Sequence, residues 1–460
     1  MPEDVDETAY VSLFSGAGIG DLGVAHGDVG ARLVAACEMQ PKRASLCQHL
    51  HPQSNVFVEN VASCADDFVS YTQSRLSPGK RRPWLCVMSP PCQGMSTNGA
   101  GRISSAVKSG TRESDDPRNS LFVPGMEVVS RLLPLWVIVE NVPGMLTKPC
   151  DVVGEGDKDD DGEAPPPTVF EALKAMLERE GYDVRHKVVD FAEWGVPQRR
   201  RRLVVVARRS LPLLSSDEAG GGDLDSSSTD FFPSSDPSQV IVLKDAIGDM
   251  PALDARLKPF DDHDPWHMVP PFTPHVHFCV SHTPYASSAM QNERCARCDA
   301  RASAEAVVCP SCDAVLPRPM VFSKGGRPVR RTKGFKTSYR RMRWEAPAST
   351  ITTNSGVASS DLKLHPVQNR VLSVREVMRA CTVVPSGGRG TNIRFPWQDV
   401  FPAGPDGLPP RCNVRLVRTV LGECIPPLAL HCVVSRLRDL DHSHTKEPND
   451  WGNKTLHNII

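Results

Sequence analysis

Short apolar runs alternate with longer amphipathic stretches in the first half of the chain. Each run is aliphatic or β-branched and is bounded by Gly, Pro or Asn, which is typical of buried strands. The runs lie at residues 10–14, 33–37, 85–89, 136–140, 184–189 and 203–207. Residues 118–133 and 168–179 have the period of amphipathic helices. This alternation predicts an α/β fold in which helices cover a parallel sheet.

The pattern changes after residue 240. Residues 240–343 show little alternation and carry many prolines, four closely spaced cysteines and a basic tract, whereas apolar periodicity returns near 370–378 and 417–437. The predicted domains are a core over 8–240, a smaller domain over 241–345, a return to the core over 346–440 and a polar tail over 441–460. We interpret the acidic stretch 151–167 and the Ser- and Asp-rich stretch 210–238 as surface insertions.

Composition narrows the class of protein only slightly. With 460 residues, 40% hydrophobic and 23% charged, the chain can bury a full core. Its net charge of −1 is uninformative, because a basic face can be offset by acidic loops elsewhere. No apolar run approaches the roughly 18 residues of a membrane span, and the acidic N-terminus lacks a signal-peptide pattern. We therefore expect an intracellular protein whose 15 cysteines are thiols, metal ligands or nucleophiles.

A glycine-rich segment, 13–20, follows the first predicted strand, and Glu38 falls at the end of the second. Glycines allow the backbone to approach a ligand closely, and an acidic residue about 20 positions later can bind ribose hydroxyls. A nucleoside-cofactor site fits this pattern. A dinucleotide enzyme, or simply close packing, fits it as well.

Three further segments carry candidate chemistry. Cys92 lies in Ser-Pro-Pro-Cys-Gln-Gly at the end of the strand 85–89, an edge where α/β folds bind ligands. A lone cysteine is more often a small buried hydrophobe. Glu140 ends the next strand, in Glu-Asn-Val. The segment 198–202, Gln-Arg-Arg-Arg-Arg, leads into the strand 203–207, so alternate arginines point to one side.

Taken in order, segments 14–20, 90–93, 140–142, 198–202, 370–376 and 422–427 resemble the motifs of cytosine-C5 DNA methyltransferases. The resemblance implies a Rossmann-like, S-adenosylmethionine-dependent methyltransferase sheet with a smaller target-recognition domain. It also implies methyl transfer to carbon 5 of a cytosine flipped out of DNA.

The resemblance assigns the catalytic roles. The thiolate of Cys92 would add to C6 of the base, and Glu140 would hold the N3 and N4 edge. Arg200, with Arg202, would position the base and Glu140. The basic, Gly- and Ser-rich loop after Cys92 would close over DNA, with contacts from Gln93, Ser96 and Arg102.

It also assigns the cofactor site. The expected contacts are Phe14, Ser15, Gly16, Gly18, Gly20, Glu38, Met39, Asn60, Val61, Pro90 and Leu121. Two positions depart from the family pattern: Asn60 stands where an aspartate is usual, and Glu423 stands where an asparagine is usual. Both departures put cofactor affinity in question.

The cysteines of the smaller domain form C-x2-C…C-x2-C: Cys295, Cys298, Cys309 and Cys312. This spacing suits a structural zinc knuckle rather than four unrelated thiols. From Lys324 to Arg343 there are nine Lys or Arg and no acidic residue. Unless this tract is a solvated linker, it is the best candidate for DNA contact. The predicted DNA-binding residues here are Lys324, Arg327, Arg330, Arg331, Lys333, Lys336 and Arg340.

The sequence leaves two other functions open. Transfer-RNA-directed relatives share the cysteine, glutamate and arginine motifs, although they lack this cysteine insert. A non-catalytic DNA- or chromatin-binding homologue is the other alternative, against which the chain retains Cys92, Glu140 and Arg200. We expect a monomer that binds duplex DNA and no membrane. The acidic and Ser-rich insertions resemble those of a eukaryotic nuclear protein more than a compact restriction-system enzyme. We therefore expect a nuclear location if the protein is eukaryotic, and a cytoplasmic one otherwise.

Overall fold

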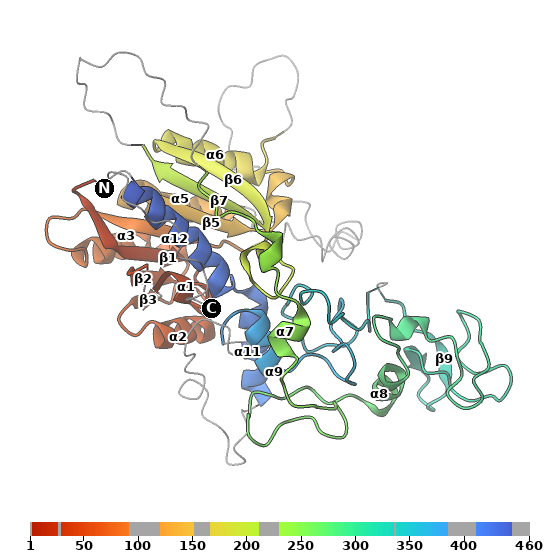
Figure 1. The fold of residues 1–460 in the computed structure, drawn as a ribbon. Helices are drawn as coiled ribbons and strands as arrows, with labels where there is room; N and C mark the ends of the chain where they lie inside the picture. Colours follow the sequence, from red (N-terminus) through yellow and green to blue (C-terminus); the bar gives the residue numbers. More distant parts are fainter. Residues whose placement is uncertain are drawn as a thin grey trace, which may run out of the picture. The chain divides into compact units, whose positions relative to one another are not determined.

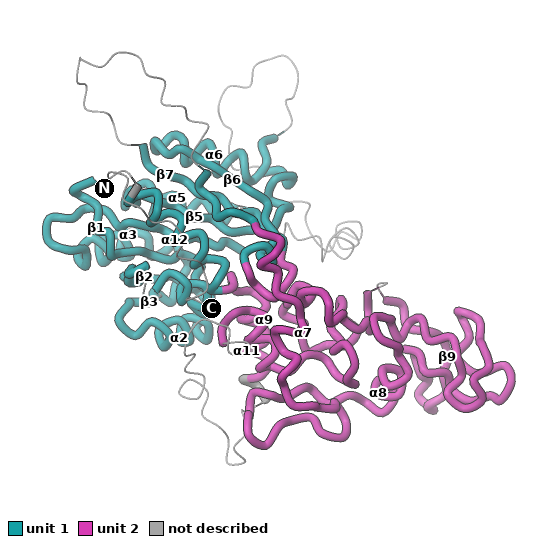
Figure 2. Tube along the Cα trace, in the orientation of Figure 1, with its two compact units in different colours: residues 1–194, 201–235, 427–452 teal, residues 195–200, 236–426, 453–460 magenta. Residues whose placement is uncertain are grey.

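The computed structural model describes residues 2–25, 29–91, 120–150, 166–210, 230–334, 337–384 and 411–443. The chain divides into two compact units, coloured separately in Figure 2. Unit 1 comprises residues 1–194, 201–235 and 427–452, and unit 2 comprises residues 195–200, 236–426 and 453–460. The predicted return to the core at 346 therefore differs from the structure, in which the chain rejoins unit 1 at Pro427.

Unit 1 is built on a seven-stranded sheet with the order β3-β2-β1-β4-β5-β7-β6 (Figure 1). The strands are β1 (Val5–Leu13), β2 (Arg32–Cys37), β3 (Asn55–Phe57), β4 (Arg82–Met88), β5 (Trp136–Asn141), β6 (Tyr182–Asp190) and β7 (Arg201–Arg209). The six predicted strands are present. The short strand β3 was not predicted, because three residues give too little alternation to recognise.

The sheet is mixed, which corrects the predicted parallel sheet. β7 lies between β5 and β6 and runs antiparallel to both. Residues 191–200 are all that connect β6 to β7. A parallel crossover needs about a dozen residues or more, so this connection reverses the chain direction instead.

Helices α3 (Val61–Ser74), α5 (Phe122–Leu132) and α6 (Val169–Arg179) pack on the sheet through one apolar core. Alternate residues of the strands face this core, among them Val11 and Leu13 of β1 and Val137 and Val139 of β5. The helix α6 begins with a capping box in which Thr168 and Glu171 satisfy each other's backbone N–H groups.

The last described helix, α12 (Pro427–Ser443), completes unit 1. Its Asp441 accepts hydrogen bonds from the indole N–H groups of Trp84 in β4 (2.8 Å) and Trp136 in β5 (3.0 Å). Near its start, α12 packs on α1 (Leu22–Ala25). A Cβ on Gly23 would lie 2.0 Å from the Pro427 carbonyl oxygen, so only glycine fits there.

The segment Val414–His442 is long and apolar enough to cross a membrane by length and composition alone. However, 67% of its most apolar window is buried inside the protein. Burial of this kind is typical of a core helix.

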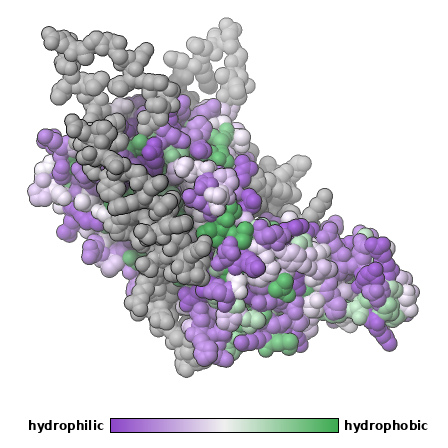
Figure 3. All heavy atoms as spheres, viewed as in Figure 1, coloured by the Kyte–Doolittle hydropathy of each residue, from purple (hydrophilic) through white to green (hydrophobic). Residues whose placement is uncertain are grey.

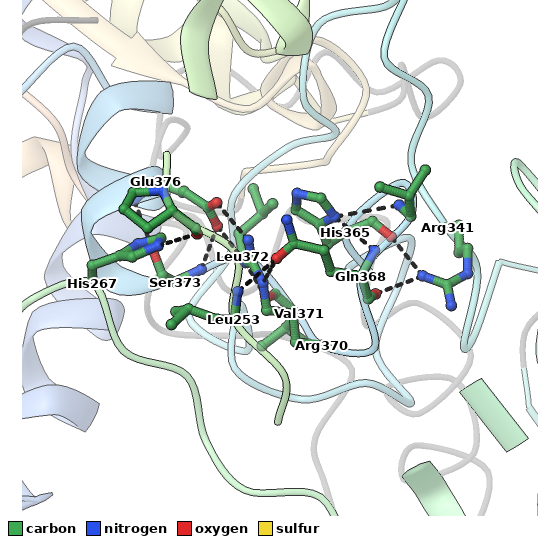
Figure 4. A network of polar contacts seen from close by, with 12 residues as sticks. Leu253, His267, Arg341, His365, Gln368, Arg370, Val371, Leu372, Ser373 and Glu376 are labelled. Atoms are coloured by element: carbon green, nitrogen blue, oxygen red, sulfur yellow. Dashed lines mark hydrogen bonds and ion pairs between the residues drawn. The ribbon is translucent and has the colours of Figure 1, made fainter. Parts of the chain in front are cut away.

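In its described residues, unit 2 has little regular structure. It contains the helices α7 (Leu243–Ile247), α8 (Pro274–Ser281), α9 (Val374–Ala380) and α11 (Arg411–Glu423) and a two-stranded ribbon, β8 (Met320–Phe322) and β9 (Pro328–Arg331). A buried polar network organises the loops around α9 (Figure 4). Arg370 forms a bidentate ion pair with Glu376 at 2.6 and 2.8 Å, and neither side chain is exposed. Ser373 caps α9 through a capping box with Glu376.

Candidate active site

The glycine-rich turn after β1 has a backbone that depends on glycine. Gly16 and Gly18 have φ angles of +58° and +69°. A Cβ on Gly18 would lie 2.8 Å from Cys47 Sγ and 2.9 Å from a ring carbon of His51, so this position tolerates no side chain. Nothing lies within 4 Å of the place where a Cβ on Gly16 would be. The turn therefore packs against Cys47 and His51 at Gly18, whereas the space beside Gly16 is open.

Glu38 joins this turn to the end of β2. Its two carboxylate oxygens accept backbone N–H bonds from Gly16 (3.1 Å) and Gln40 (2.8 Å), and the residue is 7% exposed. Ser15 also donates its N–H to the Cys37 carbonyl at 3.1 Å. A carboxylate offers about four lone-pair positions, so Glu38 can still accept from ribose hydroxyls in the open space beside Gly16. These residues fit a nucleoside cofactor.

Four other predicted cofactor residues lie after β2 or at the starts of α3 and α5. Met39 is 58% exposed directly after Glu38, where an adenine ring could pack. Asn60 caps α3 by accepting from the Ala62 N–H at 3.1 Å, so part of its acceptor capacity is already used. Val61 is buried in the core, which leaves its main chain for any ligand contact. Leu121 is the N-cap of α5.

Phe14, Gly20 and Pro90 complete that set. Phe14 adopts a left-handed backbone conformation with φ +56°, which is uncommon for a residue with a side chain. Its carbonyl accepts from the Ser89 hydroxyl at 3.2 Å, which connects the glycine-rich turn to the end of β4. Gly20 lies in the turn that leads into α1 and accepts from the Gly23 N–H at 2.9 Å.

The ends of β4 and β5 and the start of β7 form the candidate catalytic edge. Glu140, 8% exposed at the end of β5, forms an ion pair with Arg202 at the start of β7, with 2.8 Å between Nε and Oε1. The next residue, Asn141, donates to the Pro90 carbonyl at 3.1 Å. Pro90 precedes Cys92 by two residues, so Asn141 fixes the chain that leads to the predicted nucleophile.

Arg200 is held by three backbone carbonyls. Its guanidinium is buried at 2% exposure and donates to the carbonyls of Ile351 and Gly422, both at 3.1 Å, and of Glu423 at 3.3 Å. These contacts lie within unit 2. They connect the segment around residues 350–353 to the end of α11. Arg202 forms an ion pair with Glu140.

Several predicted site residues lie outside the described residues. They are Cys92, Gln93, Ser96, Arg102 and Lys336. The insertions predicted at 151–167 and 210–238 fall largely outside them as well.

Two supporting residues, Asn141 and Gln198, lie within the recognised motifs but were not predicted. Asn141 orients the Pro90 carbonyl, as described above. Gln198 is fully buried, donates to the Ala380 carbonyl at 3.1 Å and accepts from the Ile351 N–H at 2.8 Å. Both are amides beside charged residues, and nothing in the sequence separates such an amide from one on the surface.

The four cysteines of unit 2 converge. Their Sγ atoms all lie within 4.8 Å of one another, and the pairs Cys295–Cys312 and Cys298–Cys309 are 3.6 Å apart. Sulfurs around a tetrahedral zinc ion, with Zn–S bonds of about 2.3 Å, stand roughly 3.8 Å apart. The donor set and its spacing therefore fit zinc.

The cluster is built from two similar turns, each with the sequence Cys-x-x-Cys-Asp-Ala. In both, the N–H two residues after the first cysteine points at its sulfur, at 3.4 Å from Arg297 to Cys295 and at 3.4 Å from Ser311 to Cys309. The backbone N–H groups of Cys298 and Arg297 lower the pKa of the Cys295 thiol to about 6. A thiolate held by N–H donors is ready to bind a metal ion.

The predicted DNA-binding side chains divide into two groups. Lys324, Arg327, Arg330 and Lys333 are exposed. Arg331 instead donates to the carbonyls of Ala304 and Met290, and Arg340 donates to the Ala286 carbonyl and the Gln291 amide oxygen.

The seven-stranded sheet, its glycine-rich turn and the acidic residue after β2 have the arrangement of an α/β enzyme that binds a nucleoside cofactor. Residues 8–385 match the family model of C-5 cytosine-specific DNA methylases, and the chain belongs to this family. The family resemblance found in the sequence is thereby confirmed, and with it the enzyme class, DNA (cytosine-5-)-methyltransferase.

Curated relatives agree with this family. The Type II methyltransferase M1.HgaI of Avibacterium volantium is 26% identical over 443 residues, which cover 93% of this chain and 97% of the relative. The Type II methyltransferase M.AgeI of Thalassovita gelatinovora is 24% identical, covering 80% and 90%. Both organisms are bacteria, so these comparisons give no support to the expected nuclear compartment.

The solved structures support the fold. A prophage-encoded DNA modification methyltransferase of E. coli aligns with a TM-score of 0.52 at 15% identity, covering 94% of this chain and 99% of the other. At this identity the likeness concerns the α/β methyltransferase fold alone.

Proposed function

We propose that this protein methylates carbon 5 of a flipped cytosine in duplex DNA through a covalent adduct with Cys92. The observation that carries the proposal is the buried Glu140–Arg202 ion pair beside the chain segment of Pro90. A carboxylate held by one arginine at a strand edge, next to the segment that leads to a cysteine, suits the pyrimidine chemistry of the family. The proposed setting is the cytoplasm of a bacterial cell, as for the curated relatives.

The chemistry assigns a task to each group. The Cys92 thiolate adds to C6, which moves electron density onto C5 and N3 of the ring. Glu140 binds the N4 amino group and favours a proton at N3, so the ring does not carry a full negative charge. Arg202 holds the Glu140 carboxylate in place. After methylation of C5, loss of the C5 proton returns an electron pair to the ring and expels the Cys92 thiolate.

S-adenosylmethionine, when bound, supplies the electrophilic methyl group. In this chain Glu38 would bind the ribose hydroxyls, and the open backbone at Gly16 would lie against the ligand. Met39 would cover the adenine. Asn60, already engaged as the cap of α3, would make at most a partial contact with the adenine amino group.

The adduct gives a direct test. In a duplex that contains 5-fluorocytosine, C5 has no proton to lose after methylation, so the enzyme stays attached. We expect wild-type protein to form a cofactor-dependent adduct on a denaturing gel, and Cys92→Ala to form none. Cys150→Ala, which removes another buried cysteine of unit 1, is the matched control. Absence of an adduct with the wild type would favour a non-catalytic binding protein.

The nucleic acid needs its own test, because the RNA-directed alternative shares the same residues. We expect tritium from labelled cofactor to enter duplex DNA and not transfer RNA. Label in transfer RNA alone would replace the proposed substrate with RNA.

We also propose that the four-cysteine cluster holds a structural zinc ion. We expect one zinc per chain by mass spectrometry of the metal content, and a large loss in Cys309→Ser. Cys424→Ser, a partly exposed thiol outside the cluster, should retain the metal. A wild-type protein that takes up no zinc on reconstitution would refute the assignment.

A further inference from the structure

The strands β8 and β9 form a two-stranded ribbon in unit 2, and Figure 1 labels β9. Its strands pair antiparallel, with Met320 opposite Arg331 and Val321 opposite Arg330. The turn between them is closed by a hydrogen bond from the Ser323 N–H to the Arg327 carbonyl at 2.9 Å, and it contains Gly326 with φ +76°. Such a turn gives the tip one defined shape.

The tip of the ribbon is open and basic. No atom lies within 4 Å of the place where a Cβ on Gly326 would be. Lys324, Arg327 and Arg330 are exposed, and within the described part of the chain none of them contacts a carboxylate. The sequence from Arg318 to Trp344 contains no acidic residue. In Figure 3 the end of unit 2 that carries β9 is mostly hydrophilic.

The base of the ribbon is fixed to the cysteine cluster. Arg331 donates to the Ala304 and Met290 carbonyls. Arg318, 1% exposed and two residues before β8, donates to the carbonyls of Asn292 (2.9 Å) and Ser303 (2.7 Å). Ser303 and Ala304 belong to the loop between the two Cys-x-x-Cys turns. These hydrogen bonds connect the base of the ribbon to the loop of the cysteine cluster.

Apolar side chains are exposed on the same ribbon. Val329 is 59% exposed and Val321 37% exposed. The pairing shifts between Val321 and Phe322, so Val329 is the extra residue of a β-bulge. Contact with phosphates needs positive charge and does not require exposed valines. In the major groove, however, the thymine methyl group offers an apolar contact for such side chains.

We propose that the β8–β9 ribbon enters the major groove of DNA and that Lys324, Arg327 and Arg330 determine the target sequence. The inference rests on the proposed DNA methylation and adds how the target is chosen. Two strands about 4.8 Å apart, with side chains, fit a groove about 12 Å wide, which admits a two-stranded ribbon. An arginine at the tip can bind O6 and N7 of guanine with its two parallel N–H donors.

The experiment uses the full-length protein and a pool of duplexes with randomised sequence around a cytosine. Bisulfite sequencing after the reaction gives the preferred context. In Arg327→Ala, Lys324→Ala and Arg330→Ala we expect discrimination to fall about 5- to 150-fold at one or two base positions each, with methylation retained elsewhere. Arg301→Ala, an exposed arginine paired with Glu293 on the cysteine cluster, should keep the wild-type context.

Arg327→Lys is a second variant that separates base reading from charge. Lysine keeps the positive charge but lacks the paired N–H donors, so we expect the context to relax while the salt dependence of binding stays unchanged. As a control for folding, the unfolding temperature of each variant should equal that of the wild type.

Two outcomes would overturn the inference while leaving the proposed function intact. An unchanged context with uniformly weaker methylation would make the ribbon a phosphate contact, and unchanged context and rate would remove it from the DNA interface. Wild-type protein that methylates no duplex in the pool would instead overturn both proposals.

Discussion

Unit 1 buries apolar side chains between a sheet and its helices, whereas unit 2 buries arginines among loops. Arg318, Arg341, Arg370 and Arg418 are each at most 5% exposed. Arg341 alone donates to the carbonyls of Thr283, His365, Gln368 and Val280 and to the Asn369 side chain.

The difference follows from how backbone groups are satisfied. In a sheet each carbonyl finds an N–H on the next strand, but loop carbonyls have no such partner and are costly to bury alone. A guanidinium has five N–H donors and no acceptor, so one arginine can satisfy several carbonyls at once. Unit 2 thus replaces much of the hydrogen bonding of regular structure with side chains.

Glu376→Gln should have the largest effect and should act on unit 2. The change leaves the Arg370 charge buried without its partner, which costs roughly 3–5 kcal/mol. Hydrogen exchange should rise around residues 365–380 while the strands of unit 1 stay protected. Glu293→Gln breaks an ion pair whose side chains are 78% and 51% exposed and should change stability by less than about 1 kcal/mol. Equal loss of protection in both units would contradict the contrast.

The same pair predicts the response to acid. Burial would raise the pKa of Glu376, but the charge and hydrogen bonds of Arg370 outweigh it and lower the pKa to about 2, from 4.5. A depressed carboxyl pKa stabilises the folded state above the unfolded value and loses that effect as the pH falls. The stability difference between wild type and Glu376→Gln should therefore shrink from pH 4.5 to pH 2.

Lys363→Met tests a buried cation that is held by a backbone carbonyl. Burial lowers the pKa of Lys363 from 10.5 to about 8, and its ammonium donates to the Thr350 carbonyl at 2.6 Å. Because the unfolded chain binds the proton more tightly, wild-type stability should gain up to about 3 kcal/mol between pH 8 and pH 10.5. Chemical denaturation over this range should show no such gain in Lys363→Met. A gain of equal size in the variant would assign it to other groups.

Asp441→Ala tests the hydrogen bonds between α12 and the sheet of unit 1. It removes the acceptor of two buried indole N–H groups, at a cost of about 1–3 kcal/mol. Asp439→Ala, an exposed position of the same helix, is the control. The loss should appear in the free energy of unfolding of unit 1. If both variants behaved alike, α12 would be held by apolar packing alone.

Gly16→Ala should have the smallest effect on stability, about 1 kcal/mol, because only its positive φ disfavours a side chain and the space around it is open. Gly18→Ala should cost more, since its Cβ would also meet Cys47 and His51. Thermal unfolding gives both values. The opposite ranking would mean that the turn is packed differently from the structure.

The same contrast explains what the sequence could predict. The strands of unit 1 are continuous aliphatic runs, so six of them were found, and the short linker before β7 could have shown that the sheet is mixed. Arg200 and Arg202 were together predicted to position the base and Glu140, and of these contacts the structure describes the ion pair of Arg202 with Glu140. By contrast, Arg331 and Arg340 look identical to Arg327 in the sequence. Only tertiary structure decides which arginine meets a carbonyl and which remains exposed.

The position of α12 in the chain has a consequence for synthesis. Trp84 and Trp136 are made early, but Asp441, which accepts their indole N–H groups, emerges from the ribosome about 300 residues after Trp136. At about 5–20 residues per second, the sheet waits on the order of tens of seconds for its final helix. Residues 236–426 are synthesised before Asp441, so the indole N–H groups of Trp84 and Trp136 lack this acceptor during that time. A chain that ends at residue 426 lacks α12, so we expect the part of unit 1 that α12 covers to be exposed and prone to aggregate.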